Sequence, residues 1–178
     1  MSAKNALFVS FHPKGDIIGT LISIMELELI SKSKEETQAI GEALASLFQP
    51  GDVVLLKGDL GAGKTTFTGG VAKGLHLNEK VISPTFNIMK TYFKGDLPLY
   101  HIDAYRLEDQ NIEIGLDEYI EGDGVCLIEW PMFIEKLIPD EYLEITIRNK
   151  GGDSRSLQFV SQGEGYDRFV KFLKEKKC

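Results

Sequence analysis

The spacing of apolar residues changes several times along this chain, and each spacing predicts a different element. Apolar residues alternate with glutamates over Met25–Ile30, as they do on an edge strand. Ser33 and Glu36 then form a capping box, which predicts the start of a helix. Pro50-Gly51 is expected to end that helix. Between these signals, apolar residues recur at helical spacing, namely Ile40, Ala43, Leu44, Leu47 and Phe48.

The rest of the chain is rich in predicted strands. Short continuous apolar runs predict buried strands at Asp52–Lys57 and Val125–Ile128. Turn residues between β-rich stretches predict two hairpins, which join Phe86–Phe93 to Leu97–Ala104 and Tyr142–Arg148 to Ser154–Val160. Two further helices are expected, a short acidic one over Asn111–Ile120 and an amphipathic one over Gly165–Lys174. Because buried and alternating strands occur together, the predicted fold class is α/β with a sheet that is only partly parallel.

Residues 1–24 differ from the rest, because the alternation of apolar and polar residues that is typical of a folded domain begins at Met25. The apolar stretch Ile17–Ile24 is too short to span a bilayer, and no small-residue cleavage site follows it. We therefore expect residues 1–24 to be an N-terminal extension, introduced by cloning or by an overlong start assignment, and residues 25–178 to be one domain. The alternative is that the segment is a true N-terminal strand or flap.

Gly58–Thr65 has the spacing G-x-x-x-x-G-K-T of a phosphate-binding loop. It follows a predicted strand and precedes Thr66–Leu75, which can continue as a helix, and this is the context that the motif requires. In such a loop backbone N–H groups surround the phosphates, Lys64 reaches the outer ones, and the hydroxyl of Thr65 can bind Mg²⁺. The sequence therefore predicts nucleotide binding rather than an accidental glycine-rich turn.

Hydrolysis or transfer of a phosphate also needs carboxylates near the loop. Glu129 ends an apolar strand, where a nucleotide-binding sheet faces its phosphate loop, so it is the candidate to support Mg²⁺ directly or through a water. On a strand, His101, Asp103 and Tyr105 would share one face. Asp103 could then orient water or a Mg²⁺-bound water, and Arg106 could neutralise phosphate charge. The alternatives are a loop acid at Glu129 and a structural network around Asp103.

Two other residues are weaker candidates for this site. Thr85, in Ser83-Pro84-Thr85-Phe86, follows the loop helix and could act as a switch that senses the outer phosphate through Mg²⁺. A Ser-Pro turn would explain the same residues. Trp130 is the single tryptophan of the chain and could pack near the nucleotide, although a lone tryptophan is more often part of a core.

Composition and charge fit an ordinary globular protein of one domain. The chain has 178 residues, 43% hydrophobic and 26% charged, with a formal net charge of −7. The negative net charge argues against a protein that binds nucleic acid directly through its own surface. Cys126 and the final Cys178 make no disulfide framework, so a reducing cytoplasm is the expected location.

Four motifs in this order resemble one family. Gly58–Thr66, Ser83–Phe86, the pattern His101-x-Asp103-x-Tyr105-Arg106 and Leu127–Pro131 together are similar to TsaE (YjeE), the small bacterial ATPase of tRNA threonylcarbamoyladenosine synthesis. The resemblance runs from about Met25 to the C-terminal hairpin. It implies a three-layer P-loop NTPase fold with a mixed sheet, Mg²⁺-dependent binding of ATP or ADP, and weak intrinsic hydrolysis. It also implies TsaD and TsaB as protein partners, with tRNA reached only through their complex and no membrane involved.

The resemblance also assigns roles to matching residues. Asp103 and Glu129 are implied as catalytic acids, with Thr65 and Glu129 on Mg²⁺ and Thr85 as the switch. The residues implied to bind the nucleotide are Asp59, Leu60, Gly61, Ala62, Gly63, Lys64, Thr65, Thr66 and Trp130.

Two other functions remain open from the sequence. A small-molecule kinase would use Asp103 as the base for an acceptor hydroxyl, but such kinases usually carry an arginine-bearing lid, and most arginines here come late in the chain. A nucleotide-gated binding module would use ATP only to control docking, without requiring turnover.

Overall fold

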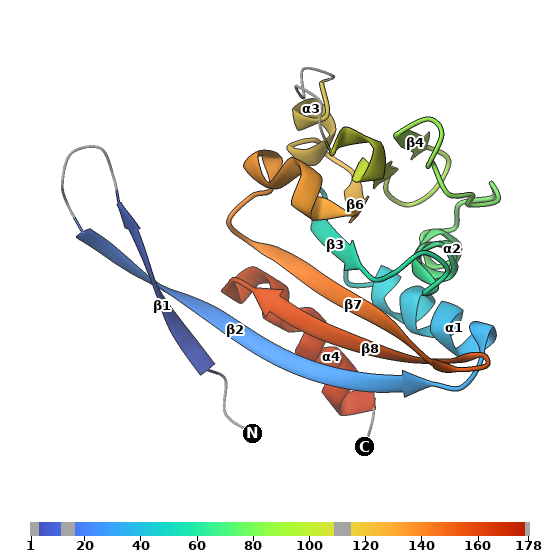
Figure 1. Cartoon of the computed structure of the whole chain (residues 1–178), viewed down its shortest axis with the longest axis horizontal. Coiled ribbons are helices and arrows are strands. Elements are labelled where there is room, and N and C mark those ends of the chain that lie inside the picture. Colours follow the sequence, from blue (N-terminus) through green and yellow to red (C-terminus); the bar gives the residue numbers. More distant parts are fainter. Residues whose placement is uncertain (1–3, 12–16, 109–114, 177–178) are drawn as a thin grey trace.

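The computed structural model describes residues 4–11, 17–108 and 115–176, with side chains from residue 23 onward. Within these residues, eight strands form a single sheet in the order β1-β2-β8-β7-β3-β6-β5-β4 (Figure 1). The strands are β1 (Lys4–Phe11), β2 (Ile17–Ser31), β3 (Val53–Lys57), β4 (Met89–Tyr92), β5 (Leu99–Asp103), β6 (Val125–Glu129), β7 (Tyr142–Gly151) and β8 (Ser154–Gln162).

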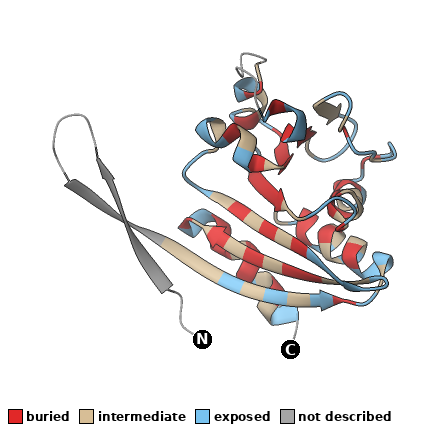
Figure 2. Cartoon of the chain, in the orientation of Figure 1, coloured by how far each residue is buried: buried red, intermediate tan, exposed pale blue. Residues whose placement is uncertain are grey.

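The sheet has a parallel half and an antiparallel half. Strand β3 pairs parallel with β7 on one side and with β6 on the other, and β6 pairs parallel with β5. The other pairings are antiparallel, namely β1 with β2, β2 with β8, β8 with β7, and β5 with β4. Strands β3, β5 and β6 are buried almost throughout, and β7 alternates between buried and partly exposed positions (Figure 2). The predicted mixed α/β sheet and both predicted hairpins are therefore confirmed.

Helices cover both faces of the sheet, which gives the three predicted layers. Helices α1 (Lys34–Ala45), α2 (Lys64–Gly74) and α4 (Asp167–Lys176) pack on one face, and that cluster includes Leu44, Phe67 and Phe169. The other face is covered by α3 (Asp117–Ile120) and two short 3-10 helices, η1 (Ala104–Leu107) and η2 (Pro131–Leu137). A third 3-10 helix, η3 (Glu164–Tyr166), precedes α4. None of the helices in the described ranges is long and apolar enough to cross a membrane.

The start of α1 follows the predicted capping box. The hydroxyl of Ser33 accepts a hydrogen bond from the backbone N–H of Glu36 at 3.1 Å, and the carboxylate of Glu36 accepts one from the N–H of Lys32 at 2.6 Å. One unpaired donor of the first helical turn and one donor of the chain just before the N-cap are thus satisfied, which stabilises this end of the helix.

Glycines bring α1 and α2 into close contact. A Cβ atom at Gly70 would lie 2.0 Å from the carbonyl oxygen of Gln38, and one at Gly74 would lie 2.5 Å from the carbonyl oxygen of Glu42. From the other helix, a Cβ atom at Gly41 would lie 2.4 Å from the carbonyl oxygen of Phe67. These distances are too short for real atoms, so the helix that carries the phosphate loop rests backbone to backbone on α1.

Three expectations need revision or fall outside the described residues. Tyr105 was expected to continue the strand face of His101 and Asp103, but the strand ends at Asp103 and Tyr105 lies in η1, so this prediction was wrong. In the described part of the acidic helix's predicted range, Asn111–Ile120, the helix covers Asp117–Ile120, and residues 111–114 of that range lie outside the described residues. Strand β2 runs from Ile17 to Ser31 across the proposed domain boundary, and the division into an extension and a domain stays a prediction.

Tyr166 gives a pH-dependent prediction for stability. Its hydroxyl oxygen accepts a hydrogen bond from the N–H of Val53 at 2.8 Å, and burial raises the pKa of Tyr166 to about 12. The unfolded phenol has a pKa of about 10, so the unfolded chain releases its proton first as the pH rises. Its contribution to stability is therefore complete below pH 10 and is lost between about pH 10 and about pH 12, with about 1 kcal/mol lost at pH 11.

Tyr166→Phe is expected to lower the free energy of unfolding by about 1–2 kcal/mol at pH 8, because the N–H of Val53 loses its acceptor. The difference from wild type should shrink by about 1 kcal/mol at pH 11, since the variant has no phenol to titrate. Urea unfolding at the two pH values measures both effects. An equal difference at pH 8 and pH 11 would contradict the assignment.

Candidate functional site

The predicted acids meet at the carboxyl edge of the parallel strands. Asp103 ends β5, Glu129 ends β6, and the two are direct register partners. Leu56 of β3 is the register partner of Glu129 on the other side, one residue before the end of that strand. The chain leaving β3 therefore enters its loop beside both carboxylates, because the carboxyl ends of parallel strands lie at one edge of a sheet.

The loop after β3 has the backbone of a phosphate-binding loop. Gly58, Gly61 and Gly63 have positive φ values of 144°, 78° and 112°, which other residues rarely adopt. Gly58 is fixed further by its neighbour, because a Cβ atom there would lie 2.4 Å from the carbonyl oxygen of Ile147 on β7. Helix α2 begins at Lys64, so the N–H groups of its first turn, which have no acceptor within the helix, face the loop.

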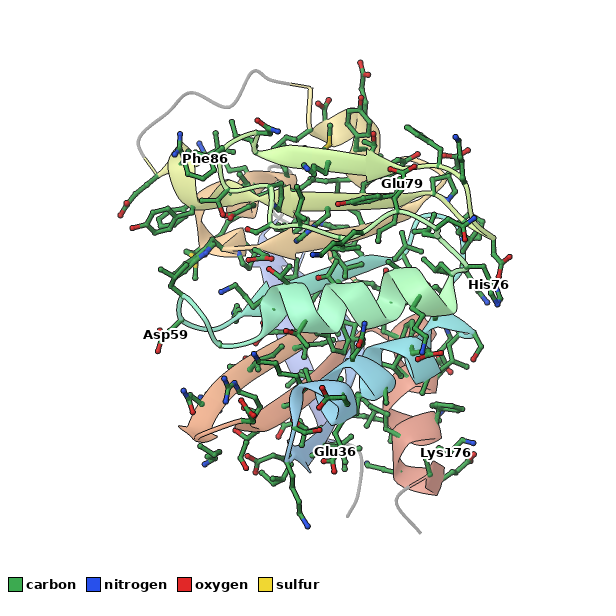
Figure 3. The ribbon with its side chains drawn as sticks, turned by 90° about the vertical axis from the view of Figure 1, so that its right-hand side faces the viewer. Glu36, Asp59, His76, Glu79, Phe86 and Lys176 are labelled. Atoms are coloured by element: carbon green, nitrogen blue, oxygen red, sulfur yellow. The ribbon has the colours of Figure 1, made fainter. Side chains whose placement is uncertain are left out.

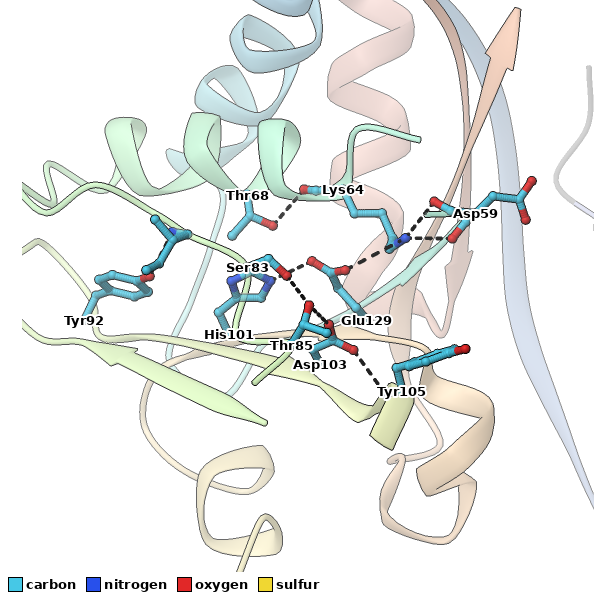
Figure 4. Close-up of polar contacts among 12 residues, drawn as sticks. Asp59, Lys64, Thr68, Ser83, Thr85, Tyr92, His101, Asp103, Tyr105 and Glu129 are labelled. Atoms are coloured by element: carbon cyan, nitrogen blue, oxygen red, sulfur yellow. Dashed lines mark hydrogen bonds and ion pairs between the residues drawn. The ribbon is translucent and has the colours of Figure 1, made fainter. Parts of the chain in front are cut away.

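Lys64 lies inside the loop rather than in solvent. Its side chain is 5% exposed, and its Nζ donates hydrogen bonds to the carbonyl oxygens of Gly58 at 2.7 Å and Asp59 at 3.0 Å (Figure 4). The Nζ atom lies 3.9 Å from Glu129 Oε2 and 4.9 Å from the ring centroid of Trp130. A buried ammonium group whose closest partners are neutral carbonyls fits an anionic ligand.

Glu129 has its own buried partner. Its Oε1 atom lies 2.8 Å from Nε2 of His101, which is fully buried. The next residue, Trp130, has left-handed backbone angles, with φ of 56° and ψ of 50°. This turn places the indole beside Tyr105, with 5.1 Å between the ring centroids.

Asp103 connects the candidate switch to the sheet. Its Oδ2 accepts a hydrogen bond from the hydroxyl of Thr85 at 2.8 Å, and its Oδ1 accepts one from the N–H of Tyr105 at 3.0 Å. The hydroxyls of Ser83 and Thr85 lie 2.7 Å apart (Figure 4). The segment before β4 is thereby tied to one of the two acids.

A pocket of about 440 Å³ unites these groups. Most of the residues predicted for the site line it, and they are Leu60, Gly61, Gly63, Lys64, Thr65, Thr66, Thr85, Asp103, Glu129 and Trp130. The roles assigned to them remain predictions. Asp59 and Ala62 line a neighbouring pocket of about 540 Å³ between the loop and β7, and the side chain of Asp59 lies at the exposed tip of the loop (Figure 3).

Some residues at the site were not among the predicted binding or catalytic residues. Ser83 and Tyr105 line the pocket, and His101 contacts Glu129. Arg155, on β8, donates from Nε to the carbonyl oxygen of Ala62 at 2.8 Å, so it braces the loop from the antiparallel half. Arg106, expected to neutralise phosphate, lies over the ring of Phe86 at 4.8 Å.

A divalent ion at this site would take some ligands from the protein and the others from phosphate oxygens and water. In the described part of the chain, no group of three or more His, Cys, Asp or Glu side chains is placed to hold a metal ion by itself. Mg²⁺ in phosphate sites usually takes one or two protein ligands together with phosphate oxygens and waters. Thr65 and Glu129, on the same pocket as Lys64, match that donor set.

The strand, the glycine loop, the helix that starts at its lysine and the acid on the neighbouring strand define a P-loop NTPase fold. Known proteins carry the same arrangement. The family model described as threonylcarbamoyl adenosine biosynthesis protein TsaE matches residues 31–157.

Individual relatives agree with the family match. The tRNA threonylcarbamoyladenosine biosynthesis protein TsaE of Bacillus subtilis is 50% identical over 148 residues, which cover 83% of this chain and 94% of that protein. The protein of the same name from Treponema pallidum is 37% identical, over 74% of this chain and 98% of its own. A crystal structure of Bacillus subtilis YdiB has a TM-score of 0.76 and 43% identity, covering 87% of this chain and 98% of that one. This chain therefore belongs to the TsaE family.

Proposed function

We propose that this protein binds ATP with Mg²⁺, hydrolyses it slowly, and supports the TsaD–TsaB pair in making threonylcarbamoyladenosine in tRNA. The observation that carries the proposal is the single pocket in which Lys64 and Thr65 of the loop face Asp103 and Glu129 on adjacent strands. Family membership supports the connection with tRNA modification. Such a role belongs in the cytoplasm, where tRNA is modified.

Each group in the pocket has a role that its chemistry suits. The loop amides and Lys64 would bind the phosphates, and the hydroxyl of Thr65 and the carboxylate of Glu129 would hold Mg²⁺. The ion, when bound, would neutralise charge that develops on the phosphate oxygens. Asp103 would orient water, and its bond to Thr85 would transmit the state of the pocket to the segment before β4.

The surroundings of the pocket support a protein partner. Leu60 is 90% exposed and Phe86 is 82% exposed, and both lie near the loop and the switch segment. Tyr105, which lines the pocket, is 49% exposed. Exposed apolar side chains around a site commonly mark a surface that another protein covers. The net charge of −7 agrees with contact to tRNA through TsaD and TsaB rather than directly.

Lys64→Ala is expected to weaken ATP binding by about 10-fold or more, because the phosphates lose a hydrogen bond to a positively charged group. Calorimetry with ATP and Mg²⁺ measures the affinity. Lys73→Ala is a matched control on the same helix, since Lys73 is exposed and pairs with Glu42 at 2.9 Å. Properly folded wild-type protein that gives no heat with ATP and Mg²⁺ would refute the proposed function.

The partner role has a separate test. Alone, the protein should turn over ATP slowly, and addition of TsaD with TsaB should raise the rate. A pull-down against these two proteins, with and without nucleotide, compares wild type with Lys64→Ala. A high rate that the partners leave unchanged would argue against the proposal.

A further inference from the structure

His101 is buried beside the pocket in an unusual hydrogen-bonding state. It lies on β5, two residues before Asp103, on the sheet face that α2 covers (Figure 4). Its Nε2 atom bonds Glu129 at 2.8 Å, whereas its Nδ1 atom is buried and has no hydrogen-bond partner in the described structure.

Stability alone does not explain this arrangement. A carboxylate accepts hydrogen bonds, so Nε2 carries the proton that bonds Glu129. Whether or not Nδ1 also carries a proton, that atom remains unpaired away from water, which costs about 1–3 kcal/mol. Native proteins rarely keep such groups without a functional reason. The one hydrogen bond that the ring makes in the described structure is the bond from Nε2 to Glu129, so we look for the function there.

The hydrogen bond fixes the direction of the Glu129 carboxylate. With Oε1 tied to His101, Oε2 is left facing Lys64 at 3.9 Å. That distance is well beyond the roughly 2.7–2.9 Å of a charge-assisted hydrogen bond, so Oε2 is not taken up by a tight pair with the lysine. One oxygen of the buried acid is thus anchored, and the other is presented to the pocket.

We infer that His101 is a positioning residue, which acts through Glu129 and sets the carboxylate oxygen available to a divalent ion at the phosphate pocket. This inference rests on the proposed function, since it concerns the same pocket. His101 itself is not among the residues that line the pocket, and its ring is fully buried. Partners that orient a metal-binding carboxylate typically contribute about 10–100-fold in metal affinity.

The test compares three substitutions of His101. Gln places an amide nitrogen where Nε2 lies and keeps the donor. Asn reaches only as far as Nδ1, and Leu has no donor at all. Trp130 is the only tryptophan of the chain and lines the pocket, so its fluorescence reports ATP binding directly, with or without Mg²⁺.

We expect the gain in ATP affinity that Mg²⁺ provides to fall about 10-fold in His101→Leu and His101→Asn. His101→Gln should stay within about threefold of wild type, because the bond to Oε1 is restored. ATP affinity without Mg²⁺ should change less than about threefold in all three, since the loop amides and Lys64 are untouched. If His101→Leu fails to fold, the Asn and Gln variants carry the same comparison.

A double-mutant cycle makes the inference specific. In a Glu129→Gln background, replacing His101 should have no further effect on the Mg²⁺-dependent gain, because the residue acts only through that carboxylate. Equal weakening with and without Mg²⁺, or additive effects in the cycle, would overturn the inference in favour of a merely structural role. A wild-type protein whose fluorescence does not respond to ATP and Mg²⁺ would instead refute the proposed function itself.

Discussion

Glu129→Gln is expected to lower the turnover of ATP by about 100-fold or more, measured with TsaD and TsaB present. The substitution keeps the size of the side chain and an oxygen for His101, so the packing at the end of β6 should survive. It removes the negative charge beside the proposed ion and the phosphates. Phosphate release under saturating ATP measures the effect, and calorimetry shows whether ATP still binds.

Glu135→Gln is the matched control for that experiment. Glu135 lies on η2, is exposed, and lines a different pocket, so the same chemical change there should leave turnover within about twofold of wild type. A Glu129→Gln rate close to wild type would show that the acid is not needed for hydrolysis. If turnover is lost and reconstituted tRNA modification continues, ATP serves only to gate docking.

Gly70→Ala is expected to lower the free energy of unfolding by about 3 kcal/mol or more, which is over 100-fold in the folding equilibrium. The added Cβ atom would lie 2.0 Å from the carbonyl oxygen of Gln38. The position of the Cβ atom is fixed by the backbone of α2 and the oxygen belongs to the backbone of α1, so neither can rotate away. Helices α1 and α2 would have to separate. Guanidinium unfolding measures the loss.

Gly69 provides the control, because it is adjacent on the same helix. A Cβ atom there would meet only the side-chain amide of Gln38 at 3.7 Å, an ordinary contact. Replacing a helical glycine with alanine normally stabilises by about 0.5–1 kcal/mol, so Gly69→Ala should raise the free energy of unfolding. Effects of the same sign at the two positions would contradict the packing described for α1 and α2.

Local patterns predicted most of the fold. The capping box at Ser33, the apolar run of β6 and both hairpins depend on residues close together in the chain, and all of them are present. The expectation that failed concerned Tyr105, where alternation was extended past the end of β5. The side chain of Asp103 accepts a hydrogen bond from the N–H of Tyr105 and starts a 3-10 turn. This bond competes with continuation of the strand, and the spacing of apolar residues does not reveal such a competition.

The site was predictable where a motif specified it and obscure where it depends on distant residues. Lys64 and Thr65 belong to a recognisable spacing, and Glu129 followed from its place at the end of a strand. His101 contacts Glu129 across 28 positions of sequence, and Arg155 contacts Ala62 across 93. Such pairs depend on the order of strands in the sheet, which a single sequence does not determine.

The attachment of the loop to β7 and β8 has a mechanical consequence. Gly58 lies against Ile147 of β7 and Ala62 is hydrogen-bonded to Arg155 of β8, so the loop is held by the antiparallel strands. Asp103 and Glu129 belong to the parallel strands on its other side. A molecule that touches the loop and both acids would therefore link the antiparallel strands to the parallel strands, in addition to the pairing of β3 with β6 and β7.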